Sequence, residues 1–284
     1  MNRALRAVLV GLLPALAPLA GAVWASAPQA GAATPAATAA VSTRAEASAG
    51  IRPPKNPSRS LAPSPDFLAA ASCFQAPNGK ECDSVVLKAI AHARSVLEHM
   101  GAMSFSLAAY LKLTRPEQLF ATVDLERVAR GMAPVRILTK SLDHIAMVGA
   151  MNNEDPPFSL LGRTLPGGGL VLGAGGNWAG GYPDPLAADY GWMYDDGFDS
   201  PNVDCTKAHP AGCWGHRDNI LGTFASRAYC PGTAPYETVM GAAYVAATAR
   251  KLDSQTELIV GVCGHAPTDV VARWSTIARK LGVR

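Results

Sequence analysis

Six cysteines constrain the fold of this 284-residue chain more than any other feature of its sequence. All of them lie after residue 70, and no Cys-x-x-Cys pair is present. In an exported chain, an even number of cysteines favours disulfide bonds over metal or redox chemistry. The local spacings predict two short disulfide-bonded loops, and a third bond follows by elimination: Cys73–Cys82, Cys205–Cys213 and Cys230–Cys263.

The N-terminus has the order of a secretory signal peptide. Two arginines in Met1–Arg6 precede a nearly all-apolar run over Ala7–Ala22, and Ala25-Ser26-Ala27 offers the small residues of a cleavage site. The run is short for a membrane span and two prolines interrupt it, which favours cleavage over the alternative of an uncleaved membrane anchor. We therefore expect a signal peptide over residues 1–27 and a secreted or cell-surface protein.

Residues 28–65 predict a linker. They consist mainly of Ala, Pro, Ser, Thr and Gly, with almost no large apolar side chain. Such a segment cannot bury enough surface to offset the entropy lost on ordering, so we expect it to be disordered. The remaining residues, 66–284, have the length of one folded domain.

The charge of the folded part and the length of its apolar stretches exclude two kinds of partner. Six of the 25 basic residues and one of the 22 acidic residues precede residue 60, which leaves 19 basic and 21 acidic residues and a formal charge of −2. A mildly acidic domain lacks the basic surface patch through which proteins bind nucleic acid. No second apolar stretch is long enough to span a bilayer, so we expect no membrane span after signal cleavage.

Apolar periodicity predicts helices that precede and separate short strands. Helices are expected over 83–100, 115–130, 142–150 and 186–194, and from about 270 to 281 with Thr268 or Asp269 as the cap. Thr114 is the expected cap of the second helix, and Gly131 its end. Strands are expected at 170–172, between turns, and at 238–246 and 256–263, as an antiparallel pair. This order suits an α+β fold, an α-β-α layered sandwich in which helices cover a sheet.

Three short segments stand out as candidate motifs. They are Gly175-Gly176-Asn177-Trp178, Trp192-Met193-Tyr194-Asp195 and Gly215-His216-Arg217-Asp218-Asn219-Ile220-Leu221. In this order they resemble the signature of the CAP superfamily of cysteine-rich secretory, SCP-like domains: a "GEN" turn, a "W-x-x-S/E" helix and a "GHR-x-NIL" segment. The resemblance spans about Leu119–Gly264, and the last motif is the most specific. It implies a small, mostly antiparallel central sheet covered by helices.

Many CAP domains hold two histidines and two acids in a cleft, sometimes with a divalent cation. In this chain only His216 falls on a family histidine, and the other histidine position falls at Asn152 or Asn153. Gly176 replaces the acid of the "GEN" turn. The acid of the "W-x-x-E" motif has a stand-in at Asp195, with Asp196 as the alternative.

The resemblance and the residue types together give a set of cleft residues without a catalytic assignment. The candidates for ligand binding are His216, Asp195, Asn177, Asn152, Asn153, Glu154, Trp178, Trp192 and Trp214. A purely structural interpretation stands beside this one: His216 holds the loop after Cys213 against the sheet, and the tryptophans fill the core.

Two functions remain open at this stage. The first is a non-enzymatic, secreted or cell-envelope domain that binds a small apolar, lipid-like ligand or an extracellular partner in a cleft near His216, with no cofactor. The second is a hydrolase in which His216, Asp195 and Glu154 hold a divalent cation such as zinc, because three protein ligands and a water form a catalytic zinc site. A serine hydrolase is disfavoured, since the chain has no G-x-S-x-G motif.

Overall fold

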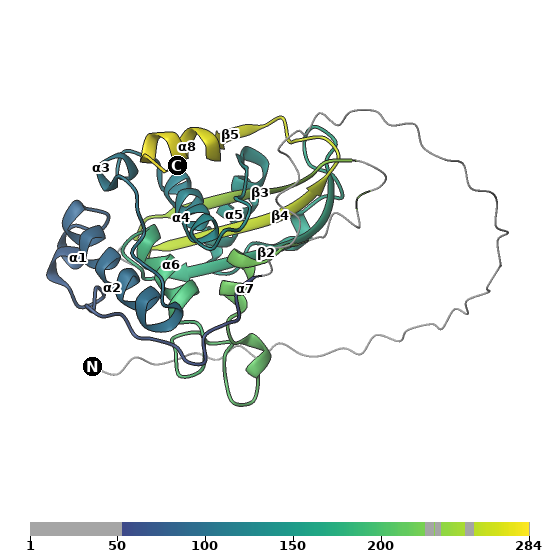
Figure 1. Cartoon of the computed structure of the whole chain (residues 1–284). Helices are drawn as coiled ribbons and strands as arrows, with labels where there is room; N and C mark the ends of the chain where they lie inside the picture. Colours follow the sequence, from purple (N-terminus) through teal and green to yellow (C-terminus); the bar gives the residue numbers. More distant parts are fainter. Residues whose placement is uncertain (1–52, 225–229, 231–233, 248–252, 284) are drawn as a thin grey trace, which may run out of the picture. The chain divides into compact units, whose positions relative to one another are not determined.

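The computed structural model describes residues 53–224, 230, 234–247 and 253–283. These residues lie in one compact unit. The predicted signal peptide and residues 28–52 of the predicted linker lie outside them. The described part has the predicted α+β fold, with helices around a five-stranded mixed sheet (Figure 1).

The regular elements follow the chain in this order. The helices are α1 (Ala71–Gln75), α2 (Lys80–Glu98), α3 (Leu107–Tyr110), α4 (Arg115–Ala129), α5 (Lys140–Asn152), α6 (Pro185–Tyr194), α7 (Gly215–Leu221) and α8 (Trp274–Leu281). The strands are β1 (Ile137–Thr139), β2 (Leu170–Gly180), β3 (Tyr236–Val245), β4 (Ser254–Cys263) and β5 (Val270–Arg273). Two short 3-10 turns cover Phe158–Leu160 and Pro210–Gly212.

The sheet is mostly antiparallel, as expected, with strand order β2-β4-β3-β1-β5. β4 pairs antiparallel with both β2 and β3, and β1 runs parallel to β3 and antiparallel to β5. Figure 1 shows β5 with α8 at one edge of the sheet and β2 with α7 near the other. The site described below lies beside β2, the edge strand.

Alternate residues of the central strands enter two different apolar cores. On β3, Met240 belongs to the core formed with α2, α4 and α6, whereas Val239 belongs to the core formed with α5. Ile259 and Val260 of β4 divide in the same way. Since side chains alternate between the faces of a strand, both faces of the sheet are covered, which is the predicted α-β-α arrangement.

A glycine sets how closely α5 approaches the sheet. A Cβ at Gly241 on β3 would lie 2.1 Å from the carbonyl carbon of Leu142. No side chain fits in that space, so α5 lies directly on the strand. The predicted N-cap of α4 is also confirmed: Thr114 and Glu117 form a reciprocal capping box.

Two predicted elements differ from the structure. The expected short strand at 170–172 continues to Gly180, so the segment matched to the "GEN" turn lies inside β2 rather than in a turn. A Cβ at Gly175 would lie 2.4 Å from Oδ1 of Asn219, so the glycine-rich composition lets α7 contact this strand. At the C-terminus, residues 270–273 form β5 because they pair with β1, and the helix begins only at Trp274, with Arg273 as its cap.

The chain contacts the domain earlier than residue 66. The amide of Leu61 donates to the carbonyl of Tyr194 at 2.9 Å, and Ser60 Oγ accepts from the amide of Gly197 at 2.6 Å. The Asn56 side chain also reaches Asp218 of α7. These backbone and side-chain hydrogen bonds tie residues 56–61, which precede the predicted boundary at residue 65, to the domain.

All three predicted disulfides are present: Cys73–Cys82, Cys205–Cys213 and Cys230–Cys263. The first joins α1 to α2, and the second closes the loop before α7. Within the described ranges, no helix has the length and apolar character needed to cross a bilayer.

Candidate functional site

The segment Gly215–Leu221 forms α7, and its first turn is capped from a preceding loop. Oδ2 of Asp196 accepts from the amide of His216 at 3.0 Å and lies 3.5 Å from that of Arg217. Trp214, just before the helix, has a positive φ of 65° and provides no side-chain cap. A carboxylate at a helix N-terminus satisfies free amides and is favoured by the helix dipole.

The same carboxylate holds the imidazole of His216. Oδ1 of Asp196 lies 2.6 Å from Nδ1 of His216, and it also accepts from the Asn202 side chain at 2.7 Å. The motif match favoured Asp195 over Asp196 as the stand-in for the acid of the "W-x-x-E" motif. Asp196 is the residue that contacts the imidazole, because the chain turns after α6 so that this residue reaches the ring, whereas Asp195 lines the same cavity. With Nδ1 engaged, Nε2 is the nitrogen left for another partner.

Opposing effects set the protonation of His216. Burial alone would lower the pKa of the imidazole, but the hydrogen bond and charge of Asp196, with the charges of Asp155 and Asp204, outweigh it and raise the pKa above 6.5. Burial also raises the pKa of Asp196, although His216 opposes that effect. His216 therefore keeps its positive charge to a higher pH than an isolated histidine does.

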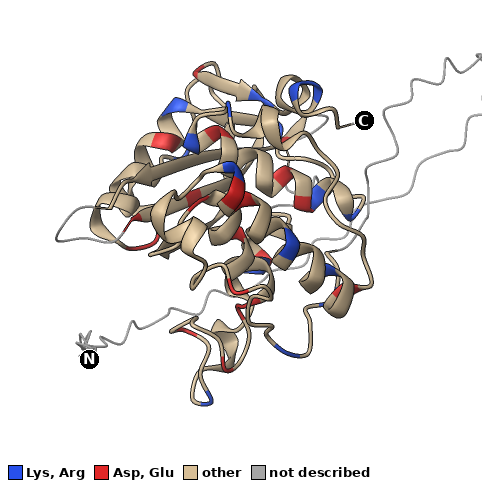
Figure 2. Cartoon of the chain, turned by 90° about the vertical axis from the view of Figure 1, so that its left-hand side faces the viewer, with Lys and Arg blue, Asp and Glu red and all other residues tan. Residues whose placement is uncertain are grey.

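His216 lines a cavity of about 350 Å³ beside the edge strand β2. The cavity brings together five of the predicted residues: His216, Asp195, Glu154, Trp178 and Trp192. It also includes Asp196, the alternative to Asp195, and residues that the sequence did not single out for this role: Asp155, Tyr182, Asn202, Val203 and Asp204, with small residues of β2 and α6. The loop over 195–213, at the bottom of Figures 1 and 2, carries several of the acidic positions coloured red in Figure 2.

Two tryptophans give the cavity a carbon surface. Nε1 of Trp192 donates to the carbonyl of Trp178 at 3.1 Å, and Nε1 of Trp178 donates to Oγ of Ser254 at 2.8 Å. Both indole N–H groups are thus used within the protein. What the two rings offer to a ligand in the cavity is their apolar surface and π-system.

Asp195 differs from its neighbour in having no partner. Its side chain is 9 % exposed and lines the cavity, yet no described residue donates a hydrogen bond or forms an ion pair with its carboxylate. Burial, reinforced by the charge of Asp196, raises the pKa of Asp195 to about 6. An unpaired, nearly buried carboxylate at a cavity wall is an acceptor that a ligand can satisfy.

Four predicted cleft residues do not line the cavity. Asn177 is fully buried beneath it, where Nδ2 donates to the carbonyl of His216 at 3.0 Å. Asn152 is exposed and bonds Glu154, and Asn153 ends α5 in the left-handed conformation. Trp214 is buried against Gly197, whose added Cβ would lie 2.7 Å from the indole. The contacts that the structure gives these four residues are with the protein itself.

A buried glutamate lies below the cavity and was missed from the sequence. Glu257 on β4 is fully buried, and its Oε1 accepts from Nδ2 of Asn177 at 2.8 Å. Burial raises the pKa of Glu257 to about 8, although the hydrogen bond from Asn177 and the charge of His216 oppose the shift. The one signal available was an acid inside the apolar run Thr256–Cys263. Asn219 of α7 completes the group by donating to Oδ1 of Asn177.

The arginine of α7 enters a buried chain of charges on the opposite side of the helix. Arg217 is fully buried and pairs with Glu98 of α2 at 2.5 Å. Glu98 also pairs with Arg130, which in turn pairs with Glu126 of α4. Glu126 further accepts from Arg94 at 2.6 Å. This network joins α2, α4 and α7, and so fixes the helix that carries His216.

The arrangement required for a metal centre is not found in the part of the chain that the structure describes. Among those residues, no group of three or more His, Cys, Asp or Glu side chains is placed to hold a metal ion. His216, Asp195 and Glu154, the expected ligand set, line one cavity but do not form such a group.

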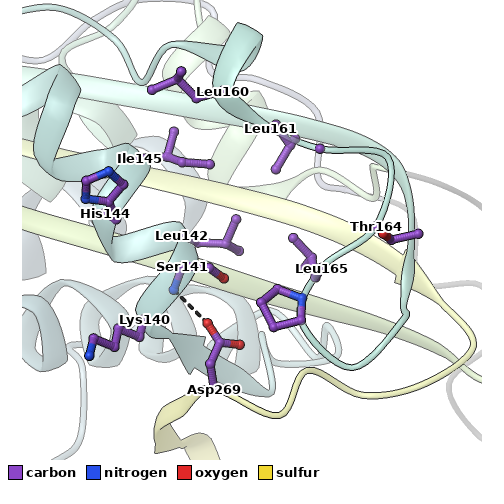
Figure 3. Close-up of a pocket in the computed structure, with 12 residues that line it drawn as sticks. Lys140, Ser141, Leu142, His144, Ile145, Leu160, Leu161, Thr164, Leu165 and Asp269 are labelled. Atoms are coloured by element: carbon purple, nitrogen blue, oxygen red, sulfur yellow. Dashed lines mark hydrogen bonds between the residues drawn. The ribbon is translucent and has the colours of Figure 1, made fainter.

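A second, larger cavity of about 640 Å³ lies away from His216, against α5. Figure 3 shows Leu142, Ile145, Leu160, Leu161 and Leu165 around it. At one end Asp269 accepts from the amide of Ser141 at 2.7 Å (Figure 3). Five leucine and isoleucine side chains line this cavity, and it contains none of the residues predicted from the family motifs.

No protein-family model matches the chain, and neither the search of curated proteins nor that of solved structures returned a match.

Proposed function

We propose that this protein is an exported, CAP-like domain that acts by binding a small extracellular or cell-envelope ligand in the His216 cavity, without catalysis. The proposal combines the CAP-like motifs with the contents of the cavity. The apolar part of the ligand packs on Trp178 and Trp192, and its polar part meets the acids and His216.

One observation carries the proposal. Glu154, Asp195 and His216 come from three segments far apart in the sequence, and they line one cavity together with two tryptophans. A cavity of this size with a few polar groups and pKa values shifted by burial has the general character of a small-molecule site. A purely structural role for His216 would not require this convergence.

The lining residues favour binding over catalysis. No serine, threonine or cysteine lines the cavity among the described residues, so a covalent nucleophile of those types is missing there. The histidine is held through Nδ1 by an acid that also caps α7, which gives that acid a structural role.

Export is supported by the N-terminal signal-like sequence and by three disulfides in the domain. Disulfides persist in oxidising compartments and are rare in the cytosol. The ligand is therefore a molecule found outside the cell or in its envelope.

The test is a titration of the purified protein with lipid-like compounds and envelope glycans. Binding is measured as a change in the fluorescence of the protein's tryptophans. Val203→Arg at the exposed rim of the cavity should abolish saturable binding, because the long side chain reaches over the opening. Val271→Arg, also at an exposed position but on β5, is the matched control and should bind as the parent does. No saturable binding, or binding that Val203→Arg leaves intact, would contradict the proposal.

A further inference from the structure

The polar groups of the His216 cavity are nearly all acceptors. Five carboxylates line it (Glu154, Asp155, Asp195, Asp196 and Asp204), and no described lysine or arginine does. The Asn202 amide nitrogen donates to Asp196 and to the carbonyl of Gly212, so its hydrogens are used within the protein. A ligand that only accepts hydrogen bonds would find few donors here, whereas one that donates would find many acceptors.

The charges of these acids are only partly balanced. His216 is paired with Asp196, which leaves Asp195 next to that pair without a cation. Glu154, Asp155 and Asp204 are exposed and lie at the rim, where they add negative potential over the opening. Unpaired buried charge is costly, so a bound cation would relieve a cost that the empty cavity bears.

Besides negative charge, the cavity has aromatic rings, which also attract organic cations. Trp178, Trp192 and Tyr182 line the cavity together with Asp195. An ammonium group near an aromatic face is attracted by the ring quadrupole, and an alkyl chain attached to it gains from the same carbon surface. The carboxylate and the rings thus act on the two parts of one ligand.

We propose that the His216 cavity binds a compact organic cation with N–H donors, a primary ammonium group on an apolar chain, with Asp195 as its counter-ion. The inference rests on the proposed function, since it names the chemical class of ligand for the same cavity. The ammonium donates to Asp195, the chain packs on the rings of Trp178 and Trp192, and the exposed acids attract the cation to the opening.

The experiment compares n-hexylammonium with 1-hexanol, which has the same chain and no charge, by calorimetric titration of the purified protein near pH 7.5. The ammonium compound should bind about tenfold or more tightly than the alcohol, because a charge-assisted hydrogen bond is made only by the former. Its affinity should fall as salt is raised, and that of the alcohol should not.

Asp195→Asn tests the counter-ion directly. It keeps the shape of the side chain and removes the charge, and since Asp195 has no internal partner the fold should be retained, which a thermal melt checks. The variant should bind the two compounds within about threefold of each other. Asp199→Asn is the matched control, because Asp199 is exposed, does not line the cavity and has a positive φ that asparagine tolerates.

The outcomes separate the two proposals. Equal binding of hexylammonium and hexanol, lost in Val203→Arg, would overturn the cation inference and leave an apolar-ligand function standing. Preference for hexylammonium that persists in Asp195→Asn would also overturn the assignment of the counter-ion. Binding of neither compound, together with no saturable binding of lipids or glycans, would contradict both.

Discussion

Asp196 binds His216 twice, through its ring and through its backbone. Oδ1 lies 2.6 Å from Nδ1 of the imidazole, and Oδ2 accepts from the His216 amide at 3.0 Å. One carboxylate thereby fixes both the side chain at the cavity wall and the start of the helix that carries it. The orientation of His216 and the stability of α7 are consequently linked.

This link predicts the titration of His216. Its pKa should lie above 6.5, since Asp196 outweighs burial. In Asp196→Asn the pKa should fall relative to the parent, because burial remains while the charge of the partner is gone and only the charges of Asp155 and Asp204 still oppose it. NMR titration of the imidazole protons checks both values, with Asp199→Asn as the control that leaves the His216 pKa unchanged. An unshifted pKa in Asp196→Asn would show that the pair does not control the ring.

Glu257 predicts a pH dependence of stability. Its pKa is raised from 4.5 to about 8 in the folded protein, so the folded state holds the proton more tightly than the unfolded state. Its contribution to the free energy of unfolding is therefore full below about pH 4.5 and is lost as the pH rises through about 8. Glu257→Gln keeps the hydrogen bond from Asn177 and does not ionise. The variant should gain stability relative to the parent as the pH rises, by up to about 5 kcal/mol above pH 8.

Urea unfolding at several pH values measures this difference. Other acids titrate over the same range, so the comparison is between the variant and the parent at each pH. A constant difference between the two proteins from pH 4.5 to pH 8.5 would mean that Glu257 has an ordinary pKa in the folded state.

The buried charge network predicts a large and non-additive cost. Glu98→Gln leaves Arg217 and Arg130 without their shared carboxylate, and breaking such a buried pair costs about 3–5 kcal/mol. The double variant Glu98→Gln/Arg217→Met should lose less stability than the two single variants lose together, because both changes remove the same ion pair. Glu237→Gln, which breaks the exposed pair with Arg136, should cost less than about 1 kcal/mol and serves as the control. Additive losses would contradict the network.

The disulfide Cys205–Cys213 should matter for both stability and binding. Replacing both cysteines with serine removes a short loop constraint, which costs about 2.5 kcal/mol in the chain-entropy model. Because Asn202, Val203 and Asp204 line the cavity beside this bond, affinity for hexylammonium should also fall. The pair Cys73–Cys82 closes a loop of similar length away from the cavity, so its removal should lower stability without changing affinity. If the two double variants bind hexylammonium equally well, the loop closed by Cys205–Cys213 does not shape the binding site.

The sequence predicted elements whose signals are local. Thr114 and Glu117 have the spacing of a capping box, and both disulfides with short loops follow from cysteine spacing. β1 and β5 were not predicted, because strands of three and four residues carry no clear periodicity and exist through pairing with each other. The local sequence pattern therefore predicted a sheet covered by helices, but it did not predict the edge formed by β1 and β5.

The candidate site was predicted in part for the same reason. His216, Asp195 and Glu154 were assigned to one cleft, and they line one cavity. Which of Asp195 and Asp196 contacts the histidine depends on the direction of the chain after α6, and two identical neighbours carry no signal for it. Asn177 was assigned to the cleft from its motif, but the pairing of Asn177 with Glu257 across two strands buries it.

The central claim is that the His216 cavity is a ligand site with Asp195 as its counter-ion. A crystal structure of the protein with n-hexylammonium tests it most directly. We predict the ammonium nitrogen at about 3 Å from the Asp195 carboxylate, with the alkyl chain against Trp178 and Trp192. A hexylammonium ion bound in the apolar cavity beside α5, or an unchanged His216 cavity at a saturating concentration, would contradict the claim.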